Sequence, residues 1–153
     1  IEDGGLVLHE SGAISLHIAE KSEALMPADP VGRARAIAWA FSALNSIEPT
    51  VQELGSIDFF HAKEEWTRAR RPQVLTFLKL RLGQLSDALG DKDYLEGRFT
   101  VGDLLMSDVL RILDQSKVLD DYPTLKAYKL RCEARPAFQR AMKAQMDGFV
   151  QAA

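Results

Sequence analysis

The chain has 153 residues, of which 46% are hydrophobic and 27% charged, so it is long enough to bury the core of one ordinary globular domain. Nineteen basic and 22 acidic side chains give a net charge of −3, which argues against a nucleic-acid partner and against binding to an anionic membrane. The longest uncharged run, residues 36–47, is too short to span a membrane. The single cysteine, Cys132, excludes an internal disulfide and favours a cytoplasmic location.

The chain opens with a turn and a short strand. Asp3–Gly4–Gly5 is a turn signal, and residues 6–8 are typical of a strand that follows it. Because only Ile1 and Glu2 precede the turn, we expect this strand to lack a hairpin partner within the chain. An unpaired strand leaves backbone groups unsatisfied, so the sequence predicts that these residues belong to a larger unit.

Helical patterns account for most of the remaining residues. Ser11 is the predicted N-cap of a first helix, and Asp29–Pro30 predicts the start of a second over residues 31–54. Pro49 falls inside this second helix and predicts a kink. The apolar pattern breaks over residues 55–61. Further helices are expected from Val74 to Leu89, from Pro123 to Ala134 and from Pro136 to Met146.

The strongest local signal surrounds Thr100. Thr100 and Asp103 have the spacing of a capping box, and Phe99 and Leu104 have the spacing of a hydrophobic staple. The residues behind this cap are apolar on most sides of the helix. A helix of that kind belongs inside a bundle, so the sequence predicts a central buried helix over residues 101–113.

Residues that could carry chemistry are few. His9, His17 and His61 are scattered and there is one cysteine, so we predict no metal site. Glu10–Ser11 lies at a strand-to-helix junction, where free amides and positive partial charge suit a carboxylate ligand. Ser11 could bind that carboxylate and Glu10 an ammonium. The alternative is that Ser11 only caps its helix and Glu10 is solvated.

Several short motifs resemble the cytosolic glutathione transferases of the bacterial type. They are the strand followed by Glu10–Ser11 and a helix, Tyr94–Leu95–Glu96–Gly97, Phe99–Thr100–Val101–Gly102–Asp103, and the segments 122–128 and 135–141. The resemblance implies a mainly α fold. Residues 29–153 would form the all-helical C-terminal domain of that family, preceded in residues 1–22 by the last strand and helix of a truncated thioredoxin-like domain.

The resemblance also implies roles for individual residues. Glu10 and Ser11 would bind the γ-glutamyl end of glutathione. Asn45, in a polar file with Ser42 and Glu48, would reach the glutathione of the neighbouring subunit, and the alternative is that this file is an ordinary polar helix face. Other residues would have a pocket or structural role: Phe41, Phe59 and Phe60 as lining of an apolar substrate pocket, and Phe99, Thr100, Asp103 and Leu104 as a structural cap. For Phe41 the alternative is core packing, since aromatic residues at helical spacing mostly fill cores.

The implied activity is conjugation of the glutathione thiolate to a small hydrophobic electrophile by a homodimer, with glutathione as substrate and no metal. The catalytic Tyr, Ser or Cys of the family has no counterpart here, so no catalytic residue is assigned and the 153-residue chain alone is expected to be inactive. Two alternatives stay open: a non-catalytic assembly module, and a glutathione-dependent disulfide reductase or isomerase. An upstream Tyr or Ser would favour conjugation, whereas an upstream Cys would favour thiol–disulfide chemistry.

Overall fold

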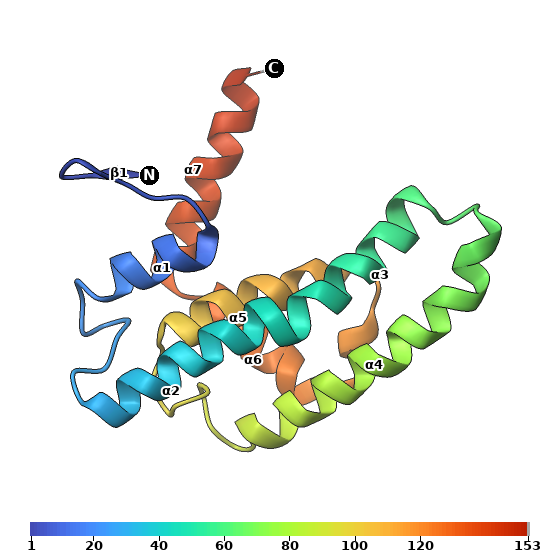
Figure 1. Cartoon of the computed structure of the whole chain (residues 1–153), viewed down its shortest axis with the longest axis horizontal. Coiled ribbons are helices and arrows are strands. Elements are labelled where there is room, and N and C mark those ends of the chain that lie inside the picture. Colours follow the sequence, from blue (N-terminus) through green and yellow to red (C-terminus); the bar gives the residue numbers. More distant parts are fainter. Residues whose placement is uncertain (153) are drawn as a thin grey trace.

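The computed structural model describes residues 1–152, with side chains through residue 149. A two-stranded hairpin precedes a bundle of helices, of which α7 projects away from the rest (Figure 1). The elements are β1 (Glu2–Asp3), β2 (Leu6–Val7), α1 (Ser11–Ala19), α2 (Pro30–Phe41), the π-helix η1 (Ser42–Ile47), α3 (Glu48–Phe60), α4 (Glu65–Leu89), α5 (Val101–Arg111), the 3₁₀ turns η2 (Ile112–Asp114) and η3 (Val118–Asp121), α6 (Pro123–Glu133) and α7 (Pro136–Ala152). The mainly α fold with a strand–helix start is therefore confirmed.

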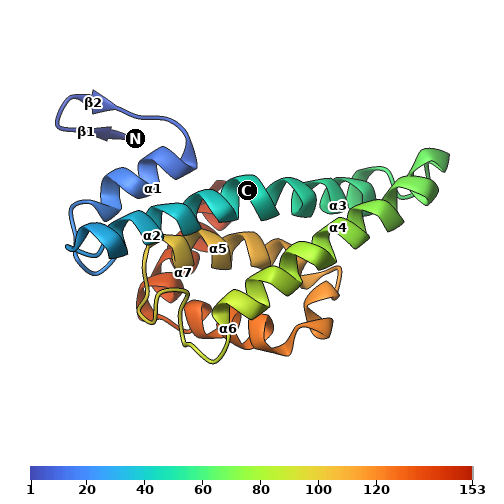
Figure 2. The same ribbon diagram turned by 60° about the horizontal axis from the view of Figure 1, so that its bottom comes forward.

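The expectation of an unpaired strand was wrong, because β1 and β2 form an antiparallel hairpin with Asp3 opposite Leu6. Gly4 and Gly5 both have positive φ, of 58° and 86°, so the turn reverses the chain within two residues. The Asp3 carboxylate accepts hydrogen bonds from Lys21 and, over 2.7 Å, from His17 Nε2. These bonds lower the pKa of Asp3 and attach the hairpin to α1, above which it lies in Figure 2.

The second predicted helix is longer and less regular than expected. Its start is confirmed, since the amide of Gly32 donates to Asp29 Oδ1 over 2.7 Å. In place of one kinked helix ending near residue 54, the chain continues from α2 through η1 and then α3 as far as Phe60. Pro49 has no N–H to give, and its ring would crowd the carbonyl four residues earlier. The wider π turns before it accommodate this proline, and the predicted break over residues 55–61 was wrong for all but the last residue.

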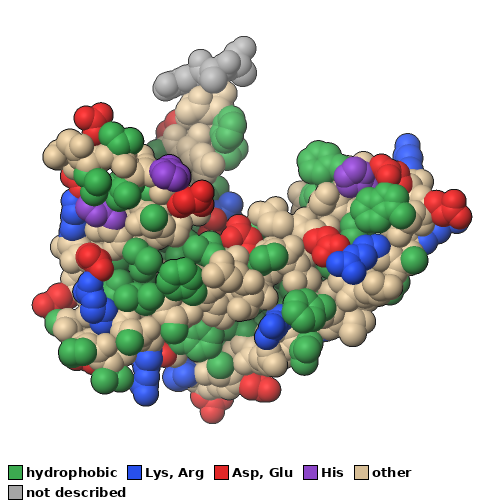
Figure 3. Space-filling view, viewed as in Figure 1, with side chains coloured by type: hydrophobic (Ala, Val, Ile, Leu, Met, Phe, Trp, Pro, Cys, Tyr) green, Lys and Arg blue, Asp and Glu red, His purple; other side chains and the backbone are tan. Residues whose placement is uncertain are grey.

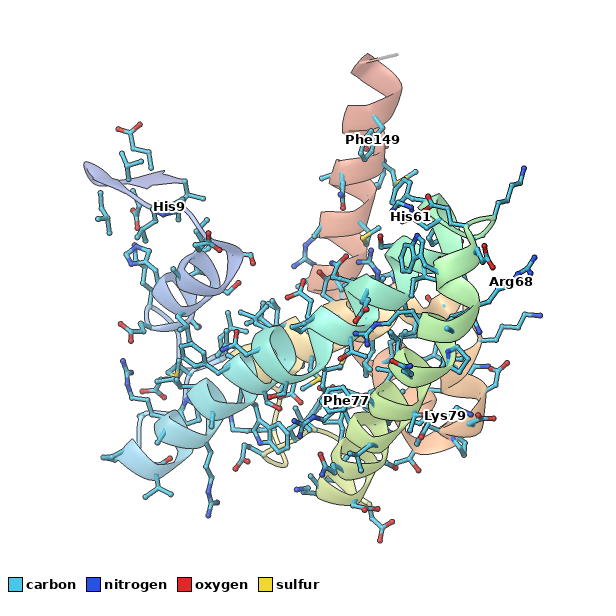
Figure 4. All side chains as sticks on the ribbon, turned by 45° about the vertical axis from the view of Figure 1, so that its right-hand side comes forward. His9, His61, Arg68, Phe77, Lys79 and Phe149 are labelled. Atoms are coloured by element: carbon cyan, nitrogen blue, oxygen red, sulfur yellow. The ribbon has the colours of Figure 1, made fainter. Side chains whose placement is uncertain are left out.

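Helix α4 begins at Glu65 and runs through Pro72, whereas the sequence predicted a start near Val74. Its N-terminal arginines contact α3: Arg70 Nε lies 2.6 Å from Glu53 Oε1, and Arg71 Nε lies 2.6 Å from Asp58 Oδ1. These ion pairs link the first turns of α4 to α3, and α4 continues through Pro72 although this residue has no backbone N–H to donate. Farther along α4, Lys79 lies beside η3 (Figure 4) and donates to Asp121 Oδ2 over 2.8 Å.

Helix α5 occupies the centre of the bundle, with α1, α2, η1, α3 and α6 packed around it (Figures 1 and 2). Gly102 allows α5 to approach α2 closely, because a Cβ at this position would lie 2.5 Å from the Cβ of Trp39 on α2. One hydrophobic core extends from Ala19 at the end of α1 to Cys132 on α6. The central, buried helix that the sequence predicted is confirmed, although its last residues form η2.

The cap of α5 is confirmed and is more extensive than a capping box. The fully buried Asp103 carboxylate accepts hydrogen bonds from the Thr100 amide and hydroxyl at its Oδ2, over 2.8 and 3.0 Å. Its Oδ1 accepts from the amide of Leu95 over 2.9 Å and from the hydroxyl of Tyr128 over 3.0 Å. Burial, together with the charge of Asp103, raises the pKa of Tyr128, so this hydroxyl remains a donor.

The predicted staple is less enclosed than its cap. Leu104 is exposed and Phe99 is half-buried. The guanidinium of Arg135 lies over the Phe99 ring at 3.3 Å from its centre. Phe99 thus links the start of α5 to the junction between α6 and α7.

Candidate functional site

The strand-to-helix junction has an unusual backbone. Glu10 is the N-cap of α1, with φ of 70°, and no side chain caps the first turn. The prediction that Ser11 caps the helix was therefore wrong, because Ser11 is already the first helical residue and is exposed. The first turn also contains no acidic residue. Within the described residues no side-chain cap and no first-turn acid offsets the positive partial charge at this end of α1, so this end suits an anionic group of a ligand.

A cleft of about 370 Å³ lies between the start of α1 and the α2–η1 segment. It brings together residues that are far apart in the sequence, namely Glu10 and Ser11 on one side and Phe41 and Asn45 on the other. Phe41 is 53% exposed, so it lines this cleft rather than filling the core. The space-filling view shows the surface hollowed between the α1 end and the α3–α4 end of the molecule (Figure 3).

The ionisable side chains that line the cleft are all acidic. Glu10 and Glu48 contribute carboxylates, Ser11 a hydroxyl and Asn45 an amide, and no Lys or Arg is among the residues that line it. Glu48 was not selected from the sequence as a site residue, although its place one turn after Asn45 was the signal that could have found it. The combination fits a ligand that carries both an ammonium and a carboxylate, because the helix end provides for the anion and the acids for the cation.

Phe59 and Phe60 lie elsewhere. They are in the last turn of α3, although the apolar helical pattern of the sequence breaks over residues 55–61. Phe59 lines a separate hollow of about 160 Å³ beside η2, and Phe60 is 82% exposed. The structure therefore does not bring them to the cleft that Phe41 lines, and their role in a substrate pocket stays a prediction.

A second cavity, of about 400 Å³, lies between α1, α5 and α7 and was not foreseen from the sequence. Its lining is largely apolar and includes Phe99, Leu105, Phe138 and Met142. Cys132 reaches its wall but is buried, and desolvation raises the pKa of its thiol to about 11. Cys132 is therefore a small buried side chain, and its raised thiol pKa makes it a poor nucleophile at neutral pH.

Neither a metal-binding cluster nor a membrane-spanning helix is found among the described residues. No group of three or more His, Cys, Asp or Glu side chains within residues 1–149 is placed to hold a metal ion. None of the helices in this part of the chain is both long and apolar enough to cross a membrane.

Residues 33–136 match the family described as glutathione S-transferase, C-terminal domain. This match spans more than half of the chain, and the chain therefore belongs to that family. A search of curated proteins returned no significant match.

Solved bacterial structures share the fold. A glutathione transferase from Burkholderia graminis, solved with two glutathione molecules bound per subunit, is 28% identical, with a TM-score of 0.82 over 88% of this chain and 59% of its own. One from Pseudomonas putida, solved with one glutathione disulfide per subunit, is 27% identical, with a TM-score of 0.83 over 93% of this chain and 65% of its own. The chain thus spans less than two thirds of the length of these neighbours.

Proposed function

We propose that the protein is a glutathione transferase, which joins the thiolate of glutathione to a small hydrophobic electrophile, and that the cleft beside α1 holds the γ-glutamyl end of glutathione. One observation carries this proposal: Glu10, Ser11 and Asn45 line a single cleft at the uncapped end of α1. The two bacterial neighbours, whose structures contain glutathione or its disulfide, support it.

Each residue has a distinct part in this proposal. The Ser11 hydroxyl and the first amides of α1 bind the α-carboxylate of the γ-glutamyl residue, and Glu10 binds its ammonium. Asn45 approaches from η1, on the opposite wall, and can donate to or accept from the peptide groups of the ligand. Conjugation itself requires the thiol to ionise and attack the electrophile, and we assign that activation to no residue of this chain. We further propose a cytoplasmic homodimer as the working form.

A disulfide reductase that uses glutathione is the second candidate. It is favoured by the glutathione disulfide in the structure of the P. putida neighbour. Both candidates require the same γ-glutamyl site, so the choice between them depends on the group that meets the sulfur atom.

Replacing Ser11 by Ala tests the proposed site. We expect the binding free energy of glutathione to weaken by about 0.5–2 kcal/mol, on the scale of one hydrogen bond, and by more if that bond is to a charged group. The free energy of unfolding should not change, because Ser11 does not cap α1. Titration calorimetry and chemical-shift titration of the labelled protein provide the affinities.

Ser15→Ala is the matched control, since Ser15 lies one turn further along α1 and lines the other cavity. Its affinity for glutathione should equal that of the unmodified protein. Equal affinities for all three proteins would remove Ser11 from the site.

A further inference from the structure

A hollow of about 190 Å³ lies between the α2–η1 segment and the second half of α4. It is separate from the cleft, because the two share no lining residue. On the sequence, Ser42 forms one polar file with Asn45 and Glu48. The structure divides this file: Ser42 lines the hollow together with Ser46, whereas the other two residues line the cleft. The proposed function therefore uses only one of the two polar faces of this helix.

The α4 wall of the hollow carries an arginine, Arg81, whose charge is not paired. Within the described residues no Asp or Glu oxygen lies within 4.0 Å of its guanidinium. Its Nη1 donates to Gln84 Oε1 over 3.1 Å, but its Nε is buried and has no hydrogen-bond partner among these residues. A buried N–H is rarely left without an acceptor, so Arg81 calls for one that the described residues do not supply.

Two other arginines of α4 show what this edge of a guanidinium binds. Arg70 donates from Nε and Nη2 to the two carboxylate oxygens of Glu53. Arg71 does the same to Asp58. In Arg81 the Nε–Nη2 edge is the one that its bond from Nη1 leaves unused. An oxyanion matches this edge with two parallel hydrogen bonds, which indicates that the acceptor is an anion.

We propose that the hollow is a binding site for a phosphate group, held by Arg81 on one wall and by the hydroxyls of Ser42 and Ser46 on the other. The side-chain nitrogen of Gln84 adds a further donor, because its oxygen already accepts from Arg81. A tetrahedral oxyanion offers acceptors in several directions, whereas one arginine edge alone satisfies a planar carboxylate. Both serines belong to the π-helix η1, and π turns within helices are frequent at functional sites.

The test is a chemical-shift titration of the labelled chain with inorganic phosphate, phenyl phosphate and acetate at constant ionic strength. We expect phosphate to shift the amides of Ser42, Ser46 and Gln84 saturably, and acetate to bind about 10-fold more weakly because it reaches fewer donors. Tighter binding of phenyl phosphate than of inorganic phosphate would support a phosphate monoester as the ligand. Equal or weaker binding would support the free anion.

Arg81→Lys keeps the charge but removes the Nε–Nη2 edge, so it should weaken phosphate binding by about 10-fold. Arg68→Lys is the matched control, because Arg68 is exposed near the start of the same helix and away from the hollow (Figure 4). Its affinity should equal that of the unmodified chain. Ser46→Ala, expected to weaken binding by about 3- to 5-fold, gives a second variant should Arg81→Lys fail to fold.

Three results would overturn the site. They are the absence of saturable shifts around the hollow, equal phosphate affinity of the unmodified chain and both folded variants of the hollow, and equal affinity for phosphate and acetate. None of them bears on the proposed function, because glutathione is assigned to the cleft and its binding is measured separately.

Discussion

At the scale of single residues, Asp103 contributes more to stability than the capping pattern around it indicates. The spacing of Thr100 and Asp103 predicted a cap, worth about 1 kcal/mol at an ordinary exposed helix start. In the structure the carboxylate is fully buried and accepts four hydrogen bonds, two of them from Leu95 and Tyr128. A buried charge is tolerated only when it is hydrogen-bonded this completely. Asp103 therefore connects the loop before α5 and helix α6 to the start of α5.

Asp103→Ala is expected to lower the free energy of unfolding by about 3 kcal/mol, because it leaves several buried donors without an acceptor at once. Tyr128→Phe is the matched comparison. It removes one of the four donors and leaves the carboxylate with three, so it should cost about 1 kcal/mol. Urea unfolding followed by circular dichroism measures both. If Asp103→Ala costs no more than Tyr128→Phe, the carboxylate is not the centre of the network.

At the scale of elements, the packing of α5 against α2 depends on the absence of a side chain at Gly102. A Cβ here would lie 2.5 Å from Trp39 Cβ and 3.1 Å from the carbonyl oxygen of Ala36, and neither is the end of a flexible side chain. The two helices would have to move apart. Since α2 continues into η1, such a movement would also shift one wall of the cleft.

Gly102→Ala is therefore expected to destabilise the protein by about 1–3 kcal/mol, even though Ala favours a helix more than Gly does. Gly83→Ala is the control, because Gly83 lies inside α4 with no atom within 4 Å of an added Cβ. There the helix propensity should act alone and stabilise the protein by about 0.5–1 kcal/mol. Thermal unfolding should shift in opposite directions for the two variants, and a shift in the same direction would contradict the close approach of α2 and α5.

At the scale of the whole molecule, the elements differ in how much of the core they hold. Helices α1 to α6 contribute buried side chains, whereas the residues that the structure describes in the hairpin and in α7 contribute none. In Figure 4 the segment that carries His9 and helix α7, which carries Phe149, project separately from the bundle. The cleft beside α1 lies where the first of these segments joins the bundle. The division into units 1–22 and 29–153 stays a prediction, although Ala19 of α1 is part of the common core.

The 153-residue chain by itself should bind glutathione but not conjugate it to an aryl halide, because we assign no thiol-activating residue within it. The assay follows absorbance of the conjugate with the purified chain, glutathione and the halide, with the uncatalysed reaction as reference. Turnover above that reference would show that the activating group lies within these residues.

The sequence by itself determined the features that depend on neighbours a few residues away. Helix starts at Asp29 and Thr100 follow from capping geometry, and the burial of α5 follows from its apolar pattern. Glu10 and Ser11 could be selected in the same way, because a strand-to-helix junction is a local feature.

Only the tertiary structure decided what depends on distant residues. Two ion pairs link the first turns of α4 to α3, and Asp103 accepts a hydrogen bond from Tyr128 on another helix. The packing of α1 against α2 places Asn45 and Glu48 opposite Glu10. Periodicity specifies which face of a helix is buried, but contacts between helices depend on their relative positions in space. The sequence thus indicated one wall of the candidate site, and the fold supplied the other.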